Sequence, residues 1–366
     1  MKIELEGFTR EQLEAALFSS ARKVRYEFTV SNAADVFLGM LEVSNPTISF
    51  DSRADVMRTF KGSVKESELM NLSCIDYRII PWMCLEISEG REAKWPLGVF
   101  IITPSKSMNA NINTIALTGY DLSKIAYDNK SISRVFVPAG AVYTSYVEQM
   151  LGENYTSIEV ESSTITKSYD QEWEIGESQL SIINTLLSGI NYNPVHFNEY
   201  GVGIVDHYIT PNDQQITGQY IANKTSVIVD GMQISSDKFS IPNKWVRYTE
   251  NVDSDYYYSS YTNEDPDSPY STVSRGRVIV NSEAVEDIAS QAELDAYVLK
   301  VAAESMQATD RLEFSTMNMP GHGYRECLWV EVPAYGIAAS YIETGWEMDL
   351  RPGGTMKHKC ERTVIL

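Results

Sequence analysis

Apolar and polar residues alternate along most of the chain, and this alternation predicts β-strands. In "RYEFTV", residues 25–30, Tyr26, Phe28 and Val30 fall on one face, which is the period of a half-buried strand. Short strands with turn residues between them suggest a small β-barrel or sandwich in the first third. Further segments carry strand patterns: 47–52, 74–80, 83–88, 99–104, 112–120, 195–210, 225–235, 243–252, 275–281, 311–317, 327–333, 340–350 and 356–366.

Proline predicts a break between two of the early strands. Pro81 and Trp82 separate the strands predicted at 74–80 and 83–88, and a proline inside a sheet is expected at an edge or a corner. We therefore predict a break in the strand at this point.

The segment "KWPLGVFIITP", residues 94–104, predicts the following strand. The strand is expected to begin through Pro96 and Gly98 and to be closed by Pro104. Pro96 should keep Trp95 extended, and the Trp95 indole should fill the corner where the strand begins.

Three segments show helical spacing instead. In 142–152 the apolar pattern ends at a glycine, and in 178–190 Ser178 is a good N-cap. Before the third helix, Ser290 and Glu293 have the spacing of a capping box. The predicted apolar faces consist of Val142, Tyr146, Met150 and Leu151, of Leu180, Ile183, Leu187 and Ile190, and of Leu294, Tyr297, Val298 and Val301.

Together these patterns predict an α+β fold dominated by β-structure. The Ser/Thr-rich span 156–170 is expected to be loop-rich or an exposed strand, and Glu199–Gly201 to turn a hairpin. In the last strand, Met356, His358 and Cys360 alternate with charged residues and should share one face. A chain of 366 residues is expected to form two to four domains.

The charge balance restricts the function classes. Thirty Lys plus Arg against fifty Asp plus Glu give a formal net charge of −20. This argues against sequence-independent binding to nucleic acid and against docking on anionic membranes, both of which need clustered cations. The simplest interpretation of the acidity is solubility.

The sequence shows no targeting segment and no cysteine pattern typical of disulfide or zinc sites. No apolar signal region stands near the first residue, and no apolar run reaches the length of about 18 residues that a membrane span requires. The four cysteines lack disulfide-framework or zinc spacing, so we expect reduced, mostly buried thiols. They are Cys74, Cys84, Cys327 and Cys360.

The sequence offers little catalytic chemistry. It contains no HExxH or HxxEH pair, no nucleophile elbow, no phosphate loop and no dinucleotide fingerprint. Asp206 and His207 are the best candidate acid–base pair, but adjacent strand residues point to opposite faces. We therefore predict no catalytic residues.

The most unusual segment is residues 251–271, with five acids, five tyrosines and no Lys or Arg. It interrupts the predicted pairing of the strand at 243–252 with the one at 275–281. It is either a solvated excursion or a contact surface, since tyrosine supplies large contact area at low entropic cost. Calcium could bind Asp253, Asp255, Glu264 and Asp267, but the EF-hand spacing is missing, and we predict no metal site. The candidate partner-contact residues are Tyr256, Tyr257, Tyr258, Tyr261, Asp265 and Asp267.

Several motifs taken in order resemble the central tail-hub family of bacteriophage baseplates. This family is shared by siphophages, contractile phages and phage-derived bacteriocins, and it includes the hub part of tail-associated lysins. The motifs are "KWPLGVFII", "TGYDLSKIAYD", "EIGESQLSIINTLLSGINY", "NKWVRYTENV", "AELDAYVLKVAAES" and "SYIETGWEMDLRPGGTMKHKCERTVIL". The resemblance covers nearly the whole chain, and the order of the motifs carries it.

The resemblance implies a multidomain hub fold with two tube-like β-barrel or sandwich domains and smaller α/β insert domains. It places a first tube-like domain at 1–122, an insert with two helices at 123–205, a second tube-like domain at 206–282 continued by 322–366, and a helix and strand insert at 283–321. It also implies a homotrimeric ring in which three chains mimic a sixfold tail tube. Tail-associated lysins often add a hydrolase after the hub; because this sequence ends at Leu366, we expect no enzymatic activity.

The resemblance further implies partners and a location. The partners would be two copies of the chain itself, the distal tail protein ring, the tail tube, the tape measure protein, and tip, spike or fibre proteins. We expect no cofactor, no specific nucleic-acid binding and no membrane insertion. The protein would be a virion tail-tip component assembled in the bacterial cytoplasm, and carboxylates facing the channel would repel passing DNA.

A second interpretation is a cell-wall-acting tip protein, either a glycan-binding module or a peptidoglycan hydrolase or endopeptidase. The 22 tyrosines and six tryptophans could stack on sugars. Most of these aromatics, however, lie on strand faces that need burying. The oligomeric state and activity on cell walls separate the two interpretations.

Overall fold

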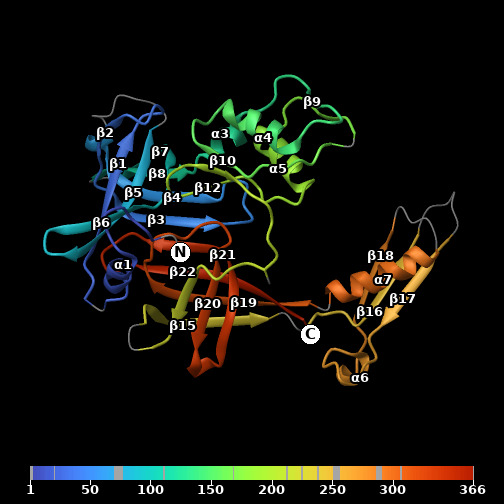
Figure 1. The fold of residues 1–366 in the computed structure, drawn as a ribbon. Coiled ribbons are helices and arrows are strands. Elements are labelled where there is room, and N and C mark those ends of the chain that lie inside the picture. The colour runs from blue at the N-terminus through green and yellow to red at the C-terminus, as the bar shows by residue number, and fades with distance from the viewer. Residues whose placement is uncertain are drawn as a thin grey trace. The chain divides into compact units, whose positions relative to one another are not determined.

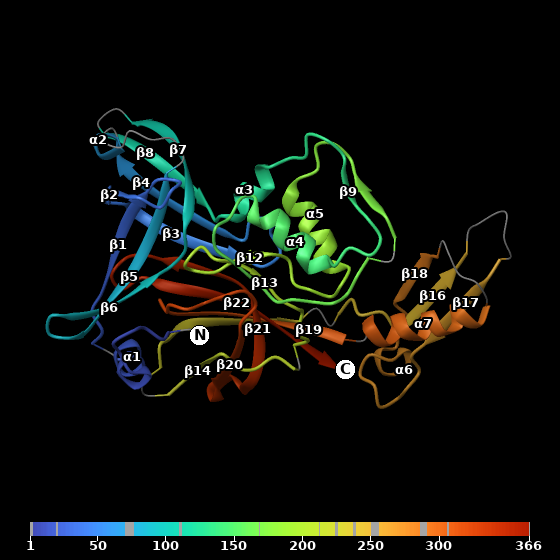
Figure 2. The same cartoon turned by 45° about the horizontal axis from the view of Figure 1, so that its top comes forward.

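The computed structural model of the protein describes residues 3–19, 21–69, 77–109, 112–167, 169–211, 213–223, 226–236, 239–249, 256–285, 291–305 and 307–365. Figures 1 and 2 show the ribbon from two directions. In chain order the elements are α1 (Arg10–Leu17), β1 (Val24–Ser31), β2 (Phe37–Met40), β3 (Ser44–Asp51), β4 (Arg58–Lys65), α2 (Glu66–Leu69), β5 (Arg78–Ser88), β6 (Arg91–Pro96), β7 (Phe100–Asn109), β8 (Ile112–Tyr120), α3 (Ser123–Asp128), β9 (Val135–Val137), α4 (Tyr143–Gly152), β10 (Ile158–Val160), β11 (Gln171–Trp173), α5 (Gln179–Ser188), β12 (His196–Phe197), β13 (Gly203–Val205), β14 (Gly218–Ile221), β15 (Ile228–Ser236), β16 (Lys244–Tyr248), β17 (Tyr258–Thr262), α6 (Thr272–Arg275), β18 (Val280–Ala284), α7 (Gln291–Ser305), β19 (Gln307–Met317), β20 (Cys327–Val332), the 3₁₀ helix η1 (Pro333–Tyr335), β21 (Ile337–Asp349) and β22 (Thr355–Ile365).

The chain divides into two compact units. The first comprises Met1–Met232 and Glu313–Cys360, and the second comprises Gln233–Leu312 and Glu361–Leu366. Strands are the main element type, which confirms the expected β-dominated fold. Among the described residues, no helix combines the length and apolar character that crossing a bilayer requires.

A large mixed sheet forms the framework. Within the described residues it has 14 strands, and its main path runs β15-β19-β22-β21-β3-β4-β8-β7-β5-β1-β2. Strand β21 joins early and late parts of the chain, because residues 337–342 pair with β20 whereas residues 345–349 pair with β3. The ribbon shows the early strands β1 to β8 meeting the late strands where β3 pairs with β21 (Figure 2).

The alternation read from the sequence matches the burial of the strands. Phe28 and Val30 of β1 are buried, as expected for one face of a half-buried strand. In β22, Met356, His358 and Cys360 are all buried at 1% exposure or less, which confirms their shared face. Cys84, Cys327 and Cys360 are buried free thiols as expected, while Cys74 lies outside the described residues.

The predicted break at Pro81 and Trp82 is wrong, because β5 runs through both residues. On one side Pro81 pairs with Phe28 of β1. On the other side β5 pairs first with β7, at 78–79, and then with β6, from Trp82 onward. Pro81 sits in the gap between these partners, where its carbonyl accepts a hydrogen bond from Leu97 N, so the missing N–H interrupts no ladder.

The predicted roles of the next prolines also need correction. Trp95 and Pro96 do not begin a strand but end a separate strand, β6, and Pro104 lies inside β7 rather than closing it. The Trp95 indole is buried as predicted, and its Nε1–H donates to the carbonyl of Ile3, 2.9 Å away. Trp95 therefore anchors the N-terminal segment that leads into α1, a helix that was not predicted from the sequence.

Helices α3, α4 and α5 pack together in one lobe (Figure 2). The helices predicted at 142–152 and 178–190 are confirmed, and Ser178 Oγ accepts the cap hydrogen bond from Ser181 N. The predicted hairpin at Glu199–Gly201 is confirmed by the pairing of β12 with β13. The core that α4 and α5 share includes Val147, Leu151, Leu180, Ile183 and Leu187.

In the second unit, α7 packs on a three-stranded sheet of order β17-β16-β18 (Figure 1). Trp245 is fully buried between the sheet and Val298 of α7. Leu294 is buried as predicted, but Tyr297 is exposed, so its place on the apolar face is wrong. Ser290 lies outside the described residues.

The acidic, tyrosine-rich segment 251–271 is not a simple excursion between two paired strands. Its residues 258–262 form β17, which pairs antiparallel with β16, while β18 pairs with β16 in parallel on the other side. Tyrosine and threonine favour strands, so the segment had a strand signal that its acids concealed.

We predict that Gly345→Ala destabilises the first unit. A Cβ on Gly345 would lie 2.9 Å from the Phe50 carbonyl oxygen, so β21 and β3 would have to move apart where they pair. Overpacking of this kind costs about 1–3 kcal/mol. Gly152→Ala is the control, because a Cβ there meets nothing within 4 Å. Urea unfolding should show a lower midpoint for Gly345→Ala alone, and equal midpoints would contradict the close contact.

Candidate functional site

The structure distributes the six candidate contact residues over different environments. Tyr256 is 69% exposed and Tyr258 is also exposed, whereas Tyr261 stacks on Trp245 with ring centroids 5.8 Å apart. Asp265 and Asp267 belong to an exposed turn in which Asp267 N donates to Asp265 Oδ1 at 2.9 Å. Tyr257 is half-buried. Of the residues weighed for calcium, Asp253 and Asp255 lie outside the described residues.

The pair Asp206 and His207 does not form an acid–base couple. His207 Nδ1 bonds Glu161 Oε2 at 2.6 Å, and Asp206 Oδ1 accepts from the Asn193 amide at 2.9 Å. The two side chains thus have separate partners, in line with their opposite directions on the chain. The His207–Glu161 pair is about half exposed on both sides.

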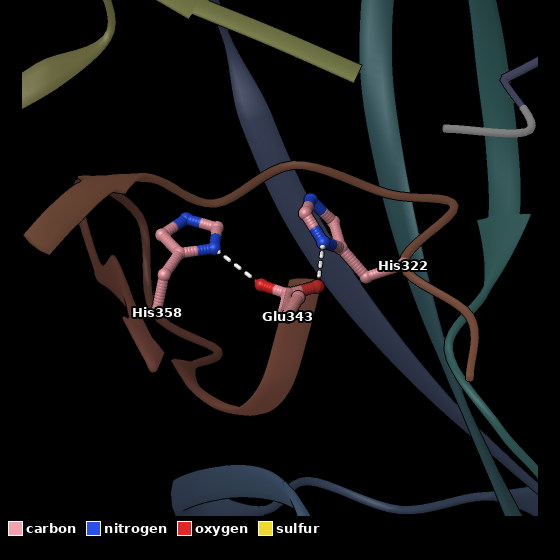
Figure 3. A group of neighbouring side chains, drawn as sticks. All are labelled: His322, Glu343 and His358. Carbon is pink, nitrogen blue, oxygen red and sulfur yellow. Dashed lines mark hydrogen bonds and ion pairs between the residues drawn. The ribbon is translucent and has the colours of Figure 1, made fainter. Parts of the chain in front are cut away.

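A cluster that no sequence motif predicted lies in the first unit: His322, Glu343 and His358. Figure 3 shows the two imidazoles on either side of the Glu343 carboxylate. His322 Nδ1 lies 2.6 Å from Glu343 Oε2, and His358 Nδ1 lies 2.6 Å from Glu343 Oε1. All three side chains have 0% exposure. The carboxylate therefore receives one imidazole N–H on each oxygen.

The remaining ring nitrogens are also hydrogen-bonded. Nε2 of His322 lies 2.9 Å from the Tyr220 hydroxyl, and Nε2 of His358 lies 2.8 Å from Thr316 Oγ1. Buried polar groups need such partners, because an unsatisfied one costs about 1–3 kcal/mol. Five side chains thus form one hydrogen-bonded network.

Each member of the cluster is positioned by a different segment. Tyr220 comes from β14, Thr316 from β19, Glu343 from β21 and His358 from β22. His322 lies in the connection between β19 and β20. Period-2 alternation puts Glu343 on the buried face of its strand, and the same alternation puts His358 between two other buried side chains of β22.

A buried arginine links the cluster to the early strands. Arg58 of β4 donates from Nη2 to the His322 carbonyl at 2.8 Å, and its guanidinium lies 5.6 Å from the Trp346 ring centroid. The Arg58 backbone N donates to Asp121 Oδ2 at 2.8 Å. Burial lowers the pKa of Arg58 and raises the pKa of Asp121.

The cluster shifts the titration of its own members. Burial alone would raise the pKa of Glu343, but the charge on His322 and hydrogen bonds from both imidazoles hold that pKa at about 2. Burial lowers the pKa of His358, against the opposing pull of Glu343. Glu343 is therefore an anion throughout the physiological range.

The donor set could attract a divalent metal, but the geometry fits hydrogen bonding better. Among the described residues, the ligand-type atoms of His322, Glu343 and His358 form a group within 4.8 Å. Two ligands of a tetrahedral zinc ion stand about 3.4 Å apart, given bond lengths of about 2.1 Å. The nitrogen–oxygen contacts here are both 2.6 Å, and each nitrogen bonds its own oxygen. Because its side chains are fully enclosed, the cluster connects strands of the sheet and is closed to a substrate. We call His322, Glu343 and His358 with their hydrogen bonds the buried joint.

We predict that Glu343→Gln destabilises the protein by about 3–5 kcal/mol, the usual cost of breaking a buried ion pair by changing one partner. The glutamine NH₂ would face an imidazole N–H, so one buried donor would lose its acceptor. Glu161→Gln is the matched control, since it meets His207 at the same distance of 2.6 Å but is about half exposed. That control should cost under about 1 kcal/mol. If chemical unfolding showed the same loss of stability for both variants, the buried carboxylate would have no special role in stability.

The same joint predicts acid sensitivity in two steps. The pKa of His358 is lowered by folding from 6.5, so the unfolded chain binds its proton more readily and stability falls as the pH drops below about 6.5. The pKa of Glu343 is lowered from 4.5 to about 2, so its stabilisation is present above pH 4.5 and is lost between these values. Unfolding free energies measured from pH 8 to 3 should begin to fall near pH 6.5 and fall more steeply below pH 4.5. A curve that stays flat down to pH 4.5 would contradict the lowered pKa of His358.

Comparisons with known proteins identify the fold. No family model matches the sequence, and no curated protein is recognisably similar to it in sequence. A tail protein from Neisseria meningitidis MC58 has a similar structure, with a TM-score of 0.61 at 12% identity over 92% of this chain and 97% of that one. The 43 kDa tail protein of prophage MuSo2 from Shewanella oneidensis gives 0.59 at 10% identity over 92% and 98%.

A structure of the PdpA–VgrG complex from Francisella is also similar, with a TM-score of 0.58 at 8% identity over 96% of this chain but only 60% of that one. These identities support conclusions about the fold rather than about individual residues. The protein has the fold of phage tail proteins, as the order of its sequence motifs predicted.

Proposed function

We propose that the protein is a structural hub at the distal end of a phage or phage-like tail. Three copies would close into a ring that links the tail tube to a tip, spike or fibre. The observation that carries the proposal is the similarity to tail proteins over nearly the full length of both chains, 92% of this chain and 97% of the Neisseria meningitidis protein. In this proposal the hub domains would be tube-like at 1–122 and at 206–282 with 322–366, with inserts at 123–205 and 283–321.

The buried joint supports a structural role. It holds four strands and a connecting loop of the first unit together with an enclosed carboxylate. A hub must keep its shape while neighbouring proteins attach to it, and interactions sealed from water are little affected by salt. The cluster offers no accessible group to a substrate, which favours assembly over catalysis as the role of this chain.

The acidic balance would serve the same function. In the ring, part of the −20 charge would face the central channel, where carboxylates repel DNA phosphates during ejection. The partners would be the distal tail protein ring, the tail tube, the tape measure protein and tip proteins, and the location would be the virion. The chain would hold no cofactor and carry out no reaction.

We predict that the purified protein forms trimers. Sedimentation velocity should give a species near three times the 41.2 kDa chain mass, and negative-stain electron microscopy should show rings. Zymography on bacterial cell walls should show no clearing. A monomer at all concentrations, together with cell-wall lysis, would overturn the proposal in favour of a cell-wall-acting tip protein.

A further inference from the structure

The large sheet contains one strand arrangement twice. Strands β3-β4-β8-β7 and β15-β19-β22-β21 lie side by side in the same order, in which the fourth strand along the chain stands between the second and the third. In both sets a further strand pairs with the first part of the third, β5 with β7 and β20 with β21. One more strand follows on the outside, β1 beside β5 and β14 beside β20. Strands β1 and β14 thus occupy matching places in the sheet.

The two sets differ at the next place in the sheet. Strand β1 runs antiparallel to β5 whereas β14 runs parallel to β20, but each has a second edge. Beyond β1 that edge is taken by β2. Beyond β14 no strand follows in the described part of the chain. A strand place that is filled in the first set is therefore open in the second.

A groove of about 420 Å³ lies along this open edge, between β14 and α1 (Figure 2). Its lining takes in residues 216–221, which include the whole of β14. On the other side it takes in Arg10, Glu14 and Phe18, which follow one another at four-residue spacing along α1 and its C-cap and so share one face. An open sheet edge is where proteins capture an extended peptide as an added strand.

The backbone of β14 has unused hydrogen-bonding groups on the groove side. In a parallel pair the bonds to the neighbour come from every second residue, and Ala222 N donates to Glu331 O of β20 at 2.8 Å. The backbone groups of Gln219 and Ile221 therefore face the groove. The Ile221 carbonyl accepts from Asn223 N at 3.0 Å, but the Ile221 N–H and both backbone groups of Gln219 have no partner on this side within the described residues. These three groups match the backbone of an added strand.

The groove favours an uncharged occupant. Its charged lining residues are Arg10 and Glu14, whose Nε and Oε1 lie 2.8 Å apart, so the lining carries no net charge although the whole chain carries −20. Ile216 is 47% exposed and Phe18 is half-buried, so both offer apolar surface to an occupant. A strand presents alternate side chains to one side. Apolar residues at alternate positions would therefore suit this lining.

The occupant must reach the edge without a sheet of its own. A strand with a neighbour on its other edge would bring that neighbour against α1, which borders the groove. Every described strand of this chain already has at least one neighbour. A second copy of the chain therefore offers no strand for the groove among its described residues, whereas a free terminus or an extended loop of a different protein fits it.

We propose that the groove between α1 and β14 binds an extended, uncharged segment of another tail protein, which adds to the open edge of β14 as a strand. The inference rests on the proposed role in a phage or phage-like tail and names the place where a neighbouring protein attaches. Main-chain hydrogen bonds at Gln219 and Ile221 supply affinity. The apolar lining and the neutral Arg10–Glu14 pair set the preference for side chains.

Two substitutions test the groove without removing a bond between β14 and β20. Gln219→Pro deletes an N–H on the groove side, where an edge strand tolerates proline, and the preceding Gly218 accepts the backbone restriction that proline imposes. Ile216→Glu puts a charge into the neutral lining. Ile132→Glu is the matched control, since Ile132 is 94% exposed and does not line the groove. Thermal unfolding checks that each variant is folded.

The probe is the assembled tail, purified from bacteria that express each chain together with the other tail proteins, and compared with the isolated chain. We expect the amide hydrogens of Gln219 and Ile221 to exchange at least about tenfold more slowly in the tail, because an added strand protects them. Gln219→Pro and Ile216→Glu should each enter tails about tenfold less than the wild type, and Ile132→Glu should match the wild type.

The outcomes separate the groove from the tail role. Wild-type protein that is absent from tails would overturn the tail role and this inference with it. Wild-type protein that is present in tails, with unprotected amides and normal incorporation of both groove variants, would overturn the groove alone. Protection that is already complete in the isolated protein would assign the groove to a second copy of the chain and overturn the claim of a different partner.

Discussion

The Glu343 carboxylate is the constraint on which the first unit depends. A charge with 0% exposure must be satisfied entirely by protein groups, and here two imidazoles supply one N–H to each oxygen. Because β14, β19, β21 and β22 each contribute a side chain to this network, none can shift without exposing an unpaired polar group. Arg58 extends the constraint to β4 through the His322 carbonyl. Strand β21 carries both the carboxylate and the pairing with β3, so the joint lies on the line where early and late strands meet.

Burial turns an ordinary interaction into this joint. The chain contains the same carboxylate–imidazole contact at Glu161 and His207, with the same 2.6 Å separation, on the surface. There water competes for both partners and salt screens their charges, so the contact adds little stability. Inside the protein the same contact cannot be exchanged for hydration, which makes it both expensive to break and specific in geometry. Position in the fold rather than residue type therefore decides what the pair does.

The sequence predicted those features that depend on neighbours along the chain. The helix begun by Ser178 and the buried face of Met356, His358 and Cys360 both follow from local periodicity, and both are confirmed. Helix α1 was missed although Thr9 and Gln12 form a capping box, because the helix is short and the segment around it reads as strands. The cluster was missed for a different reason. A buried histidine needs a polar partner, but Glu343 lies 15 positions from His358 on another strand, and no local pattern connects the two.

The comparisons separate what a fold fixes from what it leaves to each chain. At 12% identity to the Neisseria meningitidis tail protein and a TM-score of 0.61, few residues coincide while the arrangement of strands persists. Such a fold is specified by patterning and pairing, which many residues can satisfy. Roles of particular residues must then come from this chain alone. Its cluster of titratable groups is sealed from solvent, and its side chains come from four strands and a connecting loop, so in this chain the cluster holds those strands together.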